Sequence, residues 1–90
     1  MTSALEGDKV KIYWYEGRKN IIGDKVKMLR NEKGISQKAL AEQLQLLGFD
    51  FNDLTILRIE TGKRFVADYE LMALADYFDV SSDYLLGRTQ

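Results

Sequence analysis

The sequence contains no cysteine, no histidine and no proline. Without cysteine the chain can form no disulfide bond, no thiolate metal site and no cysteine nucleophile. Without histidine it lacks the usual general base and the commonest metal ligand, so we expect no enzyme activity, no metal and no cofactor. The absence of proline suits a chain made mostly of helices that are joined at glycines.

Long apolar runs are absent as well. No run approaches the roughly 18–20 residues that cross a bilayer, and no secretory signal segment stands at the N-terminus. We therefore expect a cytoplasmic protein with no membrane partner. The 90 residues correspond to one small domain, and a content of 46% hydrophobic and 30% charged residues is typical of a folded globular chain.

The net charge of −1 is unevenly distributed along the chain. Residues 1–20 carry four basic and three acidic side chains, and residues 21–62 carry six of each. Residues 63–90 carry three basic and five acidic side chains. This balance argues against a highly basic protein that coats nucleic acid without specificity, but it leaves room for a local basic patch.

Residues 1–20 form the first part of the chain, which we expect to be an N-terminal arm. In residues 9–16, Val10, Ile12 and Trp14 alternate with more polar residues. This period of two and the β-branched and aromatic content predict a β-strand. Because a lone strand is unstable, it would pair with a second subunit, pair with another protein or pack on the helical domain.

Residues 21–87 form the second part, and residues 88–90 are a tail. Gly34 fits a left-handed helix C-cap, and Ser36 and Asn52 suit the N-caps of the next two helices. Apolar residues at helical spacing predict five helices, at about 20–32, 37–47, 53–61, 68–78 and 83–86. The expected fold is therefore all-α, with five helices and a short N-terminal β-strand arm.

Three segments resemble the Cro/C1-type helix-turn-helix domain of the lambda-repressor-like, or XRE, family. The opening of that motif is similar to Gly34-Ile35-Ser36-Gln37-Lys38-Ala39-Leu40-Ala41. Its recognition helix and following loop are similar to Thr55-Ile56-Leu57-Arg58-Ile59-Glu60-Thr61-Gly62-Lys63-Arg64, and its ending to Val80-Ser81-Ser82-Asp83-Tyr84-Leu85-Leu86-Gly87. The resemblance covers residues 21–87 and implies a DNA-binding domain.

The resemblance also implies which residues meet DNA. The recognition helix, about residues 53–61, would enter the major groove, where Arg58 suits guanine, Asp53 a cytosine amino group and Leu54 a thymine methyl. The implied DNA-binding residues are Gln37, Asn52, Asp53, Leu54, Thr55, Arg58, Lys63 and Arg64. Among them, Gln37 and Asn52 stand at helix N-termini, where N–H groups can face a phosphate. Capping alone also explains Asn52.

Arg30 and Glu60 are expected to be structural and not to contact DNA. The family pattern places a basic residue late in the first helix against a glutamate near the end of the third. An ion pair between them would fix the angle between the two helices.

The segment between the second and third predicted helices departs from the family pattern. Leu44 is followed by Gln45-Leu46-Leu47-Gly48-Phe49-Asp50, which is longer than the usual turn and resembles a branch with a lengthened turn. We expect Leu47 to continue the apolar stripe of Leu40 and Leu44. At least one of Phe49 and Phe51 should be buried.

Two functions fit these observations. The first is a sequence-specific double-stranded DNA-binding transcriptional regulator, a repressor, that acts as a homodimer on a palindromic operator. Its dimer contacts would come from residues 9–16 or from the fifth helix. The alternative is an antitoxin, with a toxin as partner, or another protein-interaction module of the same fold with weak or secondary DNA binding. Asp53, Leu54 and Leu57 on the outward face and the net charge of −1 favour the alternative.

Overall fold

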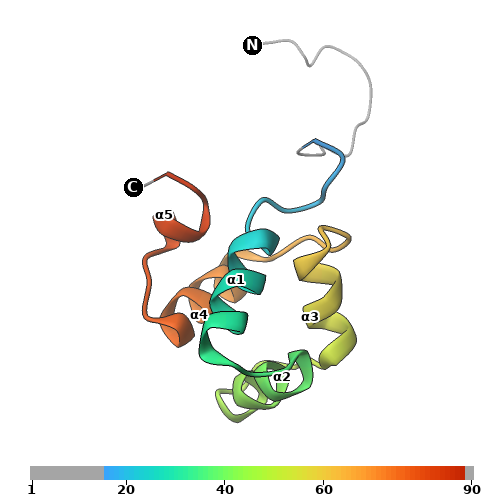
Figure 1. The fold of residues 1–90 in the computed structure, drawn as a ribbon, viewed down its shortest axis with the longest axis vertical. Helices are drawn as coiled ribbons and strands as arrows, with labels where there is room; N and C mark the ends of the chain where they lie inside the picture. Colours follow the sequence, from blue (N-terminus) through green and yellow to red (C-terminus); the bar gives the residue numbers. More distant parts are fainter. Residues whose placement is uncertain (1–15, 89–90) are drawn as a thin grey trace.

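The computed structural model describes residues 16–88. Within this range the chain forms five α-helices and no β-strand (Figure 1): α1 (Gly23–Lys33), α2 (Gln37–Leu46), α3 (Asp53–Glu60), α4 (Asp68–Phe78) and α5 (Ser82–Leu85). The predicted five-helix, all-α fold is confirmed. Of the predicted strand, residues 9–15 lie outside the described residues, and Glu16 lies in a turn. No helix in residues 16–88 is long and apolar enough to span a membrane.

Local capping sets the helix boundaries largely as the sequence predicts. The hydroxyl of Ser36 accepts a hydrogen bond from the backbone N–H of Ala39 at 3.0 Å, which starts α2. Asn52 and Thr55 form a reciprocal capping box at the start of α3. Gly34, with φ of 71°, ends α1 in the left-handed conformation that glycine adopts without steric cost.

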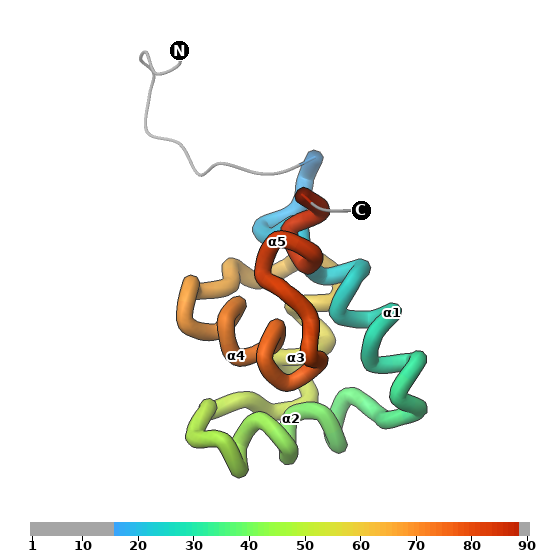
Figure 2. Tube along the Cα trace, turned by 90° about the vertical axis from the view of Figure 1, so that its left-hand side faces the viewer, coloured from blue at the N-terminus to red at the C-terminus, as the bar shows by residue number. Residues whose placement is uncertain are grey.

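The core lies where the four longer helices meet. α2 lies across the C-terminal end of α1 and the N-terminal end of α3, and α4 and α5 cover the other side of α1 (Figures 1 and 2). The largest side chains that are almost completely buried are Phe51, Leu40, Leu44, Ile56, Ile59, Leu74, Leu85 and Val26. Each helix therefore contributes at least one apolar side chain to a single core.

The prediction for Leu47 is wrong. α2 ends at Leu46, and the side chains of Leu46 and Leu47 are 80% and 59% exposed. The apolar stripe stops at Leu44 because Gly48, with φ of 97°, turns the chain back toward the core. The ring of Phe51 is 1% exposed and stacks on that of Phe49 with 6.3 Å between centroids, so the expected burial of at least one phenylalanine is confirmed.

Residue Asn20 joins the N-terminal end of α1 to the C-terminal end of α3. Its side-chain oxygen accepts hydrogen bonds from the N–H groups of Ile22 and Gly23, at 3.1 and 2.9 Å. Its amide nitrogen donates to the carbonyl oxygens of Ile59 and Arg64, at 3.1 and 2.8 Å. Asn20 is therefore outside the helix, and α1 starts at Gly23, three residues later than the sequence pattern suggests.

The predicted ion pair between α1 and α3 is confirmed. Arg30 holds the Glu60 carboxylate through Nε at 2.6 Å and through Nη2 at 3.0 Å. The hydrogen bond to Glu60 raises the pKa of Arg30 above its ordinary value. Gln37, the first residue of α2, donates to the same carboxylate at 3.0 Å. Three helices thus meet at one buried carboxylate.

Replacing Glu60 with alanine should lower the free energy of unfolding by about 3–5 kcal/mol, because Arg30 is then buried without its counter-charge. Denaturant unfolding measures the change. Glu42→Ala, at an exposed position on α2, is the matched control and should change stability by less than about 0.5 kcal/mol. A loss below about 1 kcal/mol for Glu60→Ala would contradict the structural role of the pair.

Candidate nucleic-acid interface

One face of α3 points away from the core, as the 100° spacing of its residues predicts. Ile56 and Ile59 are buried on the inner face. The outer face is formed by exposed side chains of Asp53, Leu54, Leu57, Arg58 and Thr61. Leu54 and Leu57 are 46% and 41% exposed, although both are apolar. This outer face is the surface that a groove or a partner protein would meet.

Several polar side chains on and beside this face are bonded to the backbone of α3 itself. The Asn52 side chain accepts from the N–H of Thr55 at 2.8 Å, and the Asp53 carboxylate accepts from the N–H of Leu54 at 3.0 Å. The hydroxyl of Thr61 donates to the carbonyl of Leu57 at 2.8 Å. The first and last turns of α3 are therefore stabilised by its own side chains.

Gln37 is brought to the same side of the molecule, but its amide nitrogen is bonded to Glu60 at 3.0 Å and its side chain is half-buried. This bond was not expected from the sequence. It gives Gln37 a structural task beside its predicted contact with DNA, which stays a prediction.

The two cations that follow α3, Lys63 and Arg64, have different surroundings in the structure. Lys63 is exposed. Arg64 binds both carboxylate oxygens of Glu70, at 2.9 and 3.0 Å, and its guanidinium lies 5.7 Å from the centre of the Phe51 ring. The Arg64 guanidinium holds the pKa of Glu70 below its ordinary value. Arg64 thus ties the loop to α4 and to the turn before α3.

A small pocket at the C-terminal end of α3 brings a further cation to this surface. It is lined by Gly17, Lys19, Thr61, Gly62 and Lys63. The backbone N–H of Lys19 donates to the carbonyl of Gly62 at 2.7 Å, which fixes the segment before α1 against the loop after α3. Sequence reasoning missed Lys19 because Thr61, Gly62 and Lys63, which line the pocket with it, are more than 40 residues away along the chain.

Close approach of neighbouring groups explains the two glycines at this end of α3, Gly23 and Gly62. A Cβ atom on Gly23 would lie 2.3 Å from the carbonyl oxygen of Ile59. A Cβ atom on Gly62 would lie 2.7 Å from Nε of Arg18, which donates through Nη2 to the carbonyl of Glu60 at 3.1 Å. Both glycines are needed for the segment before α1 to reach the end of α3.

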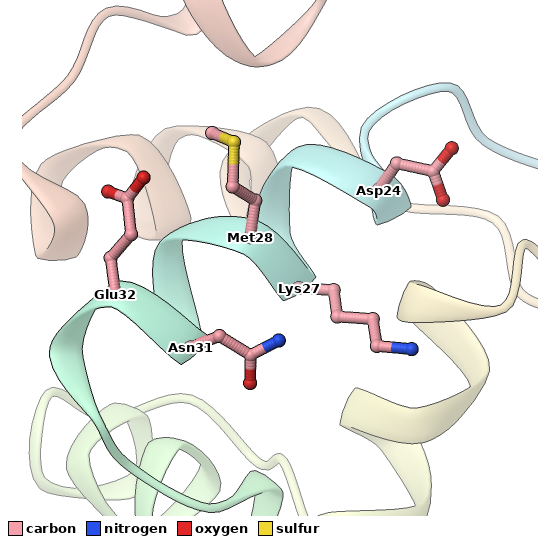
Figure 3. Close-up of a pocket in the computed structure, with 5 residues that line it drawn as sticks. All are labelled: Asp24, Lys27, Met28, Asn31 and Glu32. Atoms are coloured by element: carbon pink, nitrogen blue, oxygen red, sulfur yellow. The ribbon is translucent and has the colours of Figure 1, made fainter.

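A shallow depression along α1 is a weaker candidate for a binding site than the surface around α3 (Figure 3). It is lined by Asp24, Lys27, Met28, Asn31 and Glu32, all exposed. Lys27 extends toward α3, whereas Met28 and Glu32 point away from it (Figure 3). With mixed charge and no buried polar group, the depression has no means of selecting a small ligand. Within residues 16–88 no cluster of three or more potential metal-ligating side chains is present.

The Arg64–Glu70 pair gives a pH-dependent contribution to stability. Because the folded-state pKa of Glu70 is lowered, the contribution is present above the ordinary pKa of 4.5 and is lost as the pH falls through the lower folded value. Wild type should exceed Glu70→Gln in unfolding free energy at about pH 6, and the difference should shrink toward about pH 3. Denaturant titrations across this range measure it. Glu32→Gln, at an exposed position on α1, is the control and should show no such trend. A difference in unfolding free energy between wild type and Glu70→Gln that stays constant with pH would contradict the role given to the Arg64–Glu70 pair.

Comparison with known proteins agrees with this geometry. A family model described as helix-turn-helix matches residues 26–85, from the first turn of α1 to the end of α5. No curated protein and no solved structure matches the chain. The family match covers well over half of the sequence and includes both α2 and the outward-facing α3. The chain therefore belongs to the helix-turn-helix family of DNA-binding regulators, of the lambda-repressor-like, or XRE, type.

Proposed function

We propose that this protein is a sequence-specific double-stranded DNA-binding transcriptional repressor that acts as a homodimer, with α3 in the major groove. The observation that carries the proposal is the outer face of α3 in a helix-turn-helix frame, with the exposed Lys63 directly after the helix. A helix held in this way has the dimensions to enter a major groove, while cations at its end meet the backbone. Acting on cellular DNA, the protein would work in the cytoplasm.

The proposed contacts divide into base readers and backbone contacts. Arg58 makes a bidentate contact with guanine, Asp53 accepts from a cytosine amino group and Leu54 meets a thymine methyl. Lys63 binds a phosphate, and Lys19, which lines the same pocket, extends this cationic site.

The remaining predicted residues act at the ends of helices. Gln37 and Asn52 lie at the N-termini of α2 and α3, where the helix dipole favours a phosphate, and Thr55 lies in the first turn of α3. We give Arg64 a smaller share of phosphate binding, because Glu70 already occupies its guanidinium.

Dimerisation is proposed from the size of the module. A single small domain covers about 600–1,000 Å² of protein surface on DNA, so two copies on a palindromic site are the usual way to reach specific affinity. Residues 9–16 and α5 remain the two candidate dimer contacts.

The alternative function is an antitoxin or protein-interaction module, with a toxin as partner and DNA binding secondary. The exposed Leu54 and Leu57 are the observation that favours it. A partner protein would cover these leucines without any need for Arg58 or Lys63 to meet an anion.

Arg58→Ala should relax base preference at one position of each half-site, with a loss of about 1–3 kcal/mol of discrimination. Lys63→Ala should weaken binding to all sequences alike and should reduce the slope of log affinity against log salt by about one. A selection from random duplex DNA, followed by salt titrations on the selected operator, measures both effects.

The control is Lys25→Ala, because the Lys25 ammonium lies 5.0 Å from the centre of the ring of Tyr84, a residue of α5 and not of the α3 face. It should leave base preference unchanged. Arg58→Ala and Lys63→Ala variants that behave alike would contradict the division into base and backbone contacts. Failure to bind any duplex at low salt would contradict the proposed function itself.

Sedimentation of the full chain should give the mass of a dimer. Removing residues 1–15 keeps every contact of Arg18 and Asn20 described above, so the domain should remain folded. A monomer mass after the truncation is expected if residues 9–16 pair across the two-fold axis. A dimer mass that survives the truncation would instead assign the interface to the helical domain, and a monomeric full chain would contradict the homodimer.

A further inference from the structure

The outer face of α3 has few groups left to read base edges. The carboxylate of Asp53 and the hydroxyl of Thr61 are bonded to their own helix, at 3.0 and 2.8 Å. Thr55 and Asn52 form the capping box. Within residues 16–88, Arg58 is the side chain on this face that makes no hydrogen bond or ion pair with the rest of the chain. Hydrogen-bond reading of the major groove therefore falls to the Arg58 guanidinium and to the lone pairs that the Asp53 carboxylate keeps, and the middle of the face is left to apolar side chains.

Two leucines occupy the middle of this face. Leu54 and Leu57 are three residues apart, so their Cβ atoms lie roughly 5–6 Å from each other on adjacent turns. They are 46% and 41% exposed and lie between Asp53 and Arg58 around the helix. The one apolar group that the major groove offers to such side chains is the C5-methyl group of thymine.

We propose that Leu54 and Leu57 together read thymine methyl groups, so that each operator half-site contains neighbouring A·T pairs beside the guanine that Arg58 contacts. This inference rests on the proposed function and specifies the DNA that it takes. Discrimination at these base pairs comes from apolar contact, whereas discrimination at the guanine comes from hydrogen bonds.

The surroundings of the leucines favour DNA over a partner protein as the occupant. Lys19 and Lys63 line the pocket at the C-terminal end of α3, and Arg58 flanks Leu54, so cations border the apolar pair on two sides, while Asp53 lies beside Leu57. A stable protein interface covers about 800 Å² on each partner, far more than two half-exposed leucines provide. The other strongly exposed leucines, Leu46 and Leu47, belong to the end of α2 and not to this face.

Deoxyuridine substitution tests the proposal on the full chain. The operator is first obtained by selection from random duplex DNA. Each thymine of a half-site is then replaced singly by deoxyuridine, which removes the methyl group and keeps base pairing. We expect one or two positions at which affinity falls about fourfold, the value for one buried methyl-sized group. Deoxyuridine in the flanking sequence should change affinity by less than about 1.5-fold.

Protein variants assign each methyl group to its leucine. Leu54→Ala and Leu57→Ala should each weaken binding to the thymine operator, and each variant should become insensitive to deoxyuridine at one position. Such non-additivity is the signature of a direct contact. Leu46→Ala, which removes an 80% exposed leucine outside the interface, is the matched control and should retain full sensitivity. Thermal unfolding of all three variants verifies that they are folded.

The possible results separate the inference from the function on which it rests. If the protein binds the selected operator tightly and no deoxyuridine substitution changes the affinity, the reading of methyl groups is overturned. The repressor proposal then remains intact. Alanine variants that are folded and bind the operator as wild type does also overturn the reading of methyl groups. Absence of binding to any duplex overturns both proposals.

Discussion

The carboxylate of Glu60 is the point at which the orientation of α3 is decided. It lies at the last residue of that helix and is bound by Arg30 of α1 and by Gln37 of α2. Burying a carboxylate is costly unless it is paired and fully hydrogen-bonded. The three helices must therefore adopt the one arrangement that brings both donors to it. Apolar packing alone tolerates rearrangement more easily, so the polar contact selects a single angle for α3.

A second set of contacts holds the same end of α3 from the other side. Asn20 bonds the carbonyl of Ile59, and Arg18 bonds that of Glu60, so carbonyl groups that a helix end leaves without partners are satisfied. At the opposite end, Asn52 and Thr55 cap the first turn. With both ends fixed, little conformational freedom is lost when the outer face meets a groove, and the contacts that form there contribute more of their energy to binding.

The sequence predicted what depends on local signals, whereas the distant Arg30–Glu60 contact was predicted from the family pattern and not from the residues alone. Capping at Ser36 and Asn52 and the left-handed Gly34 are encoded within a few residues, and the structure has them as expected. Leu47 follows the helical period but is exposed, because periodicity does not reveal where a chain leaves the core.

Side chains with two possible roles were the hardest to assign. Arg64 and Gln37 have the chemistry of phosphate contacts, yet Glu70 and Glu60 bind them in the folded chain. Glu60 is 23 residues from Gln37, and only the tertiary fold brings the two together. Residue type therefore indicates what a side chain can bind, whereas the fold determines which partner it already has.

The distribution of charge resolves the tension between a net charge of −1 and DNA binding. Exposed acidic residues such as Asp68, Asp76 and Asp83 lie on α4 and α5 and not on the outer face of α3. Lys63 and Arg58 lie on the α3 side. The acidic excess of residues 63–90 therefore lies mostly outside the proposed interface, while the low total charge limits counterion release and non-specific affinity. A regulator must find its operator among many competing sites, so its specificity depends on the ratio of operator affinity to non-specific affinity. Weak non-specific binding raises this ratio even when few contacts are made in the groove.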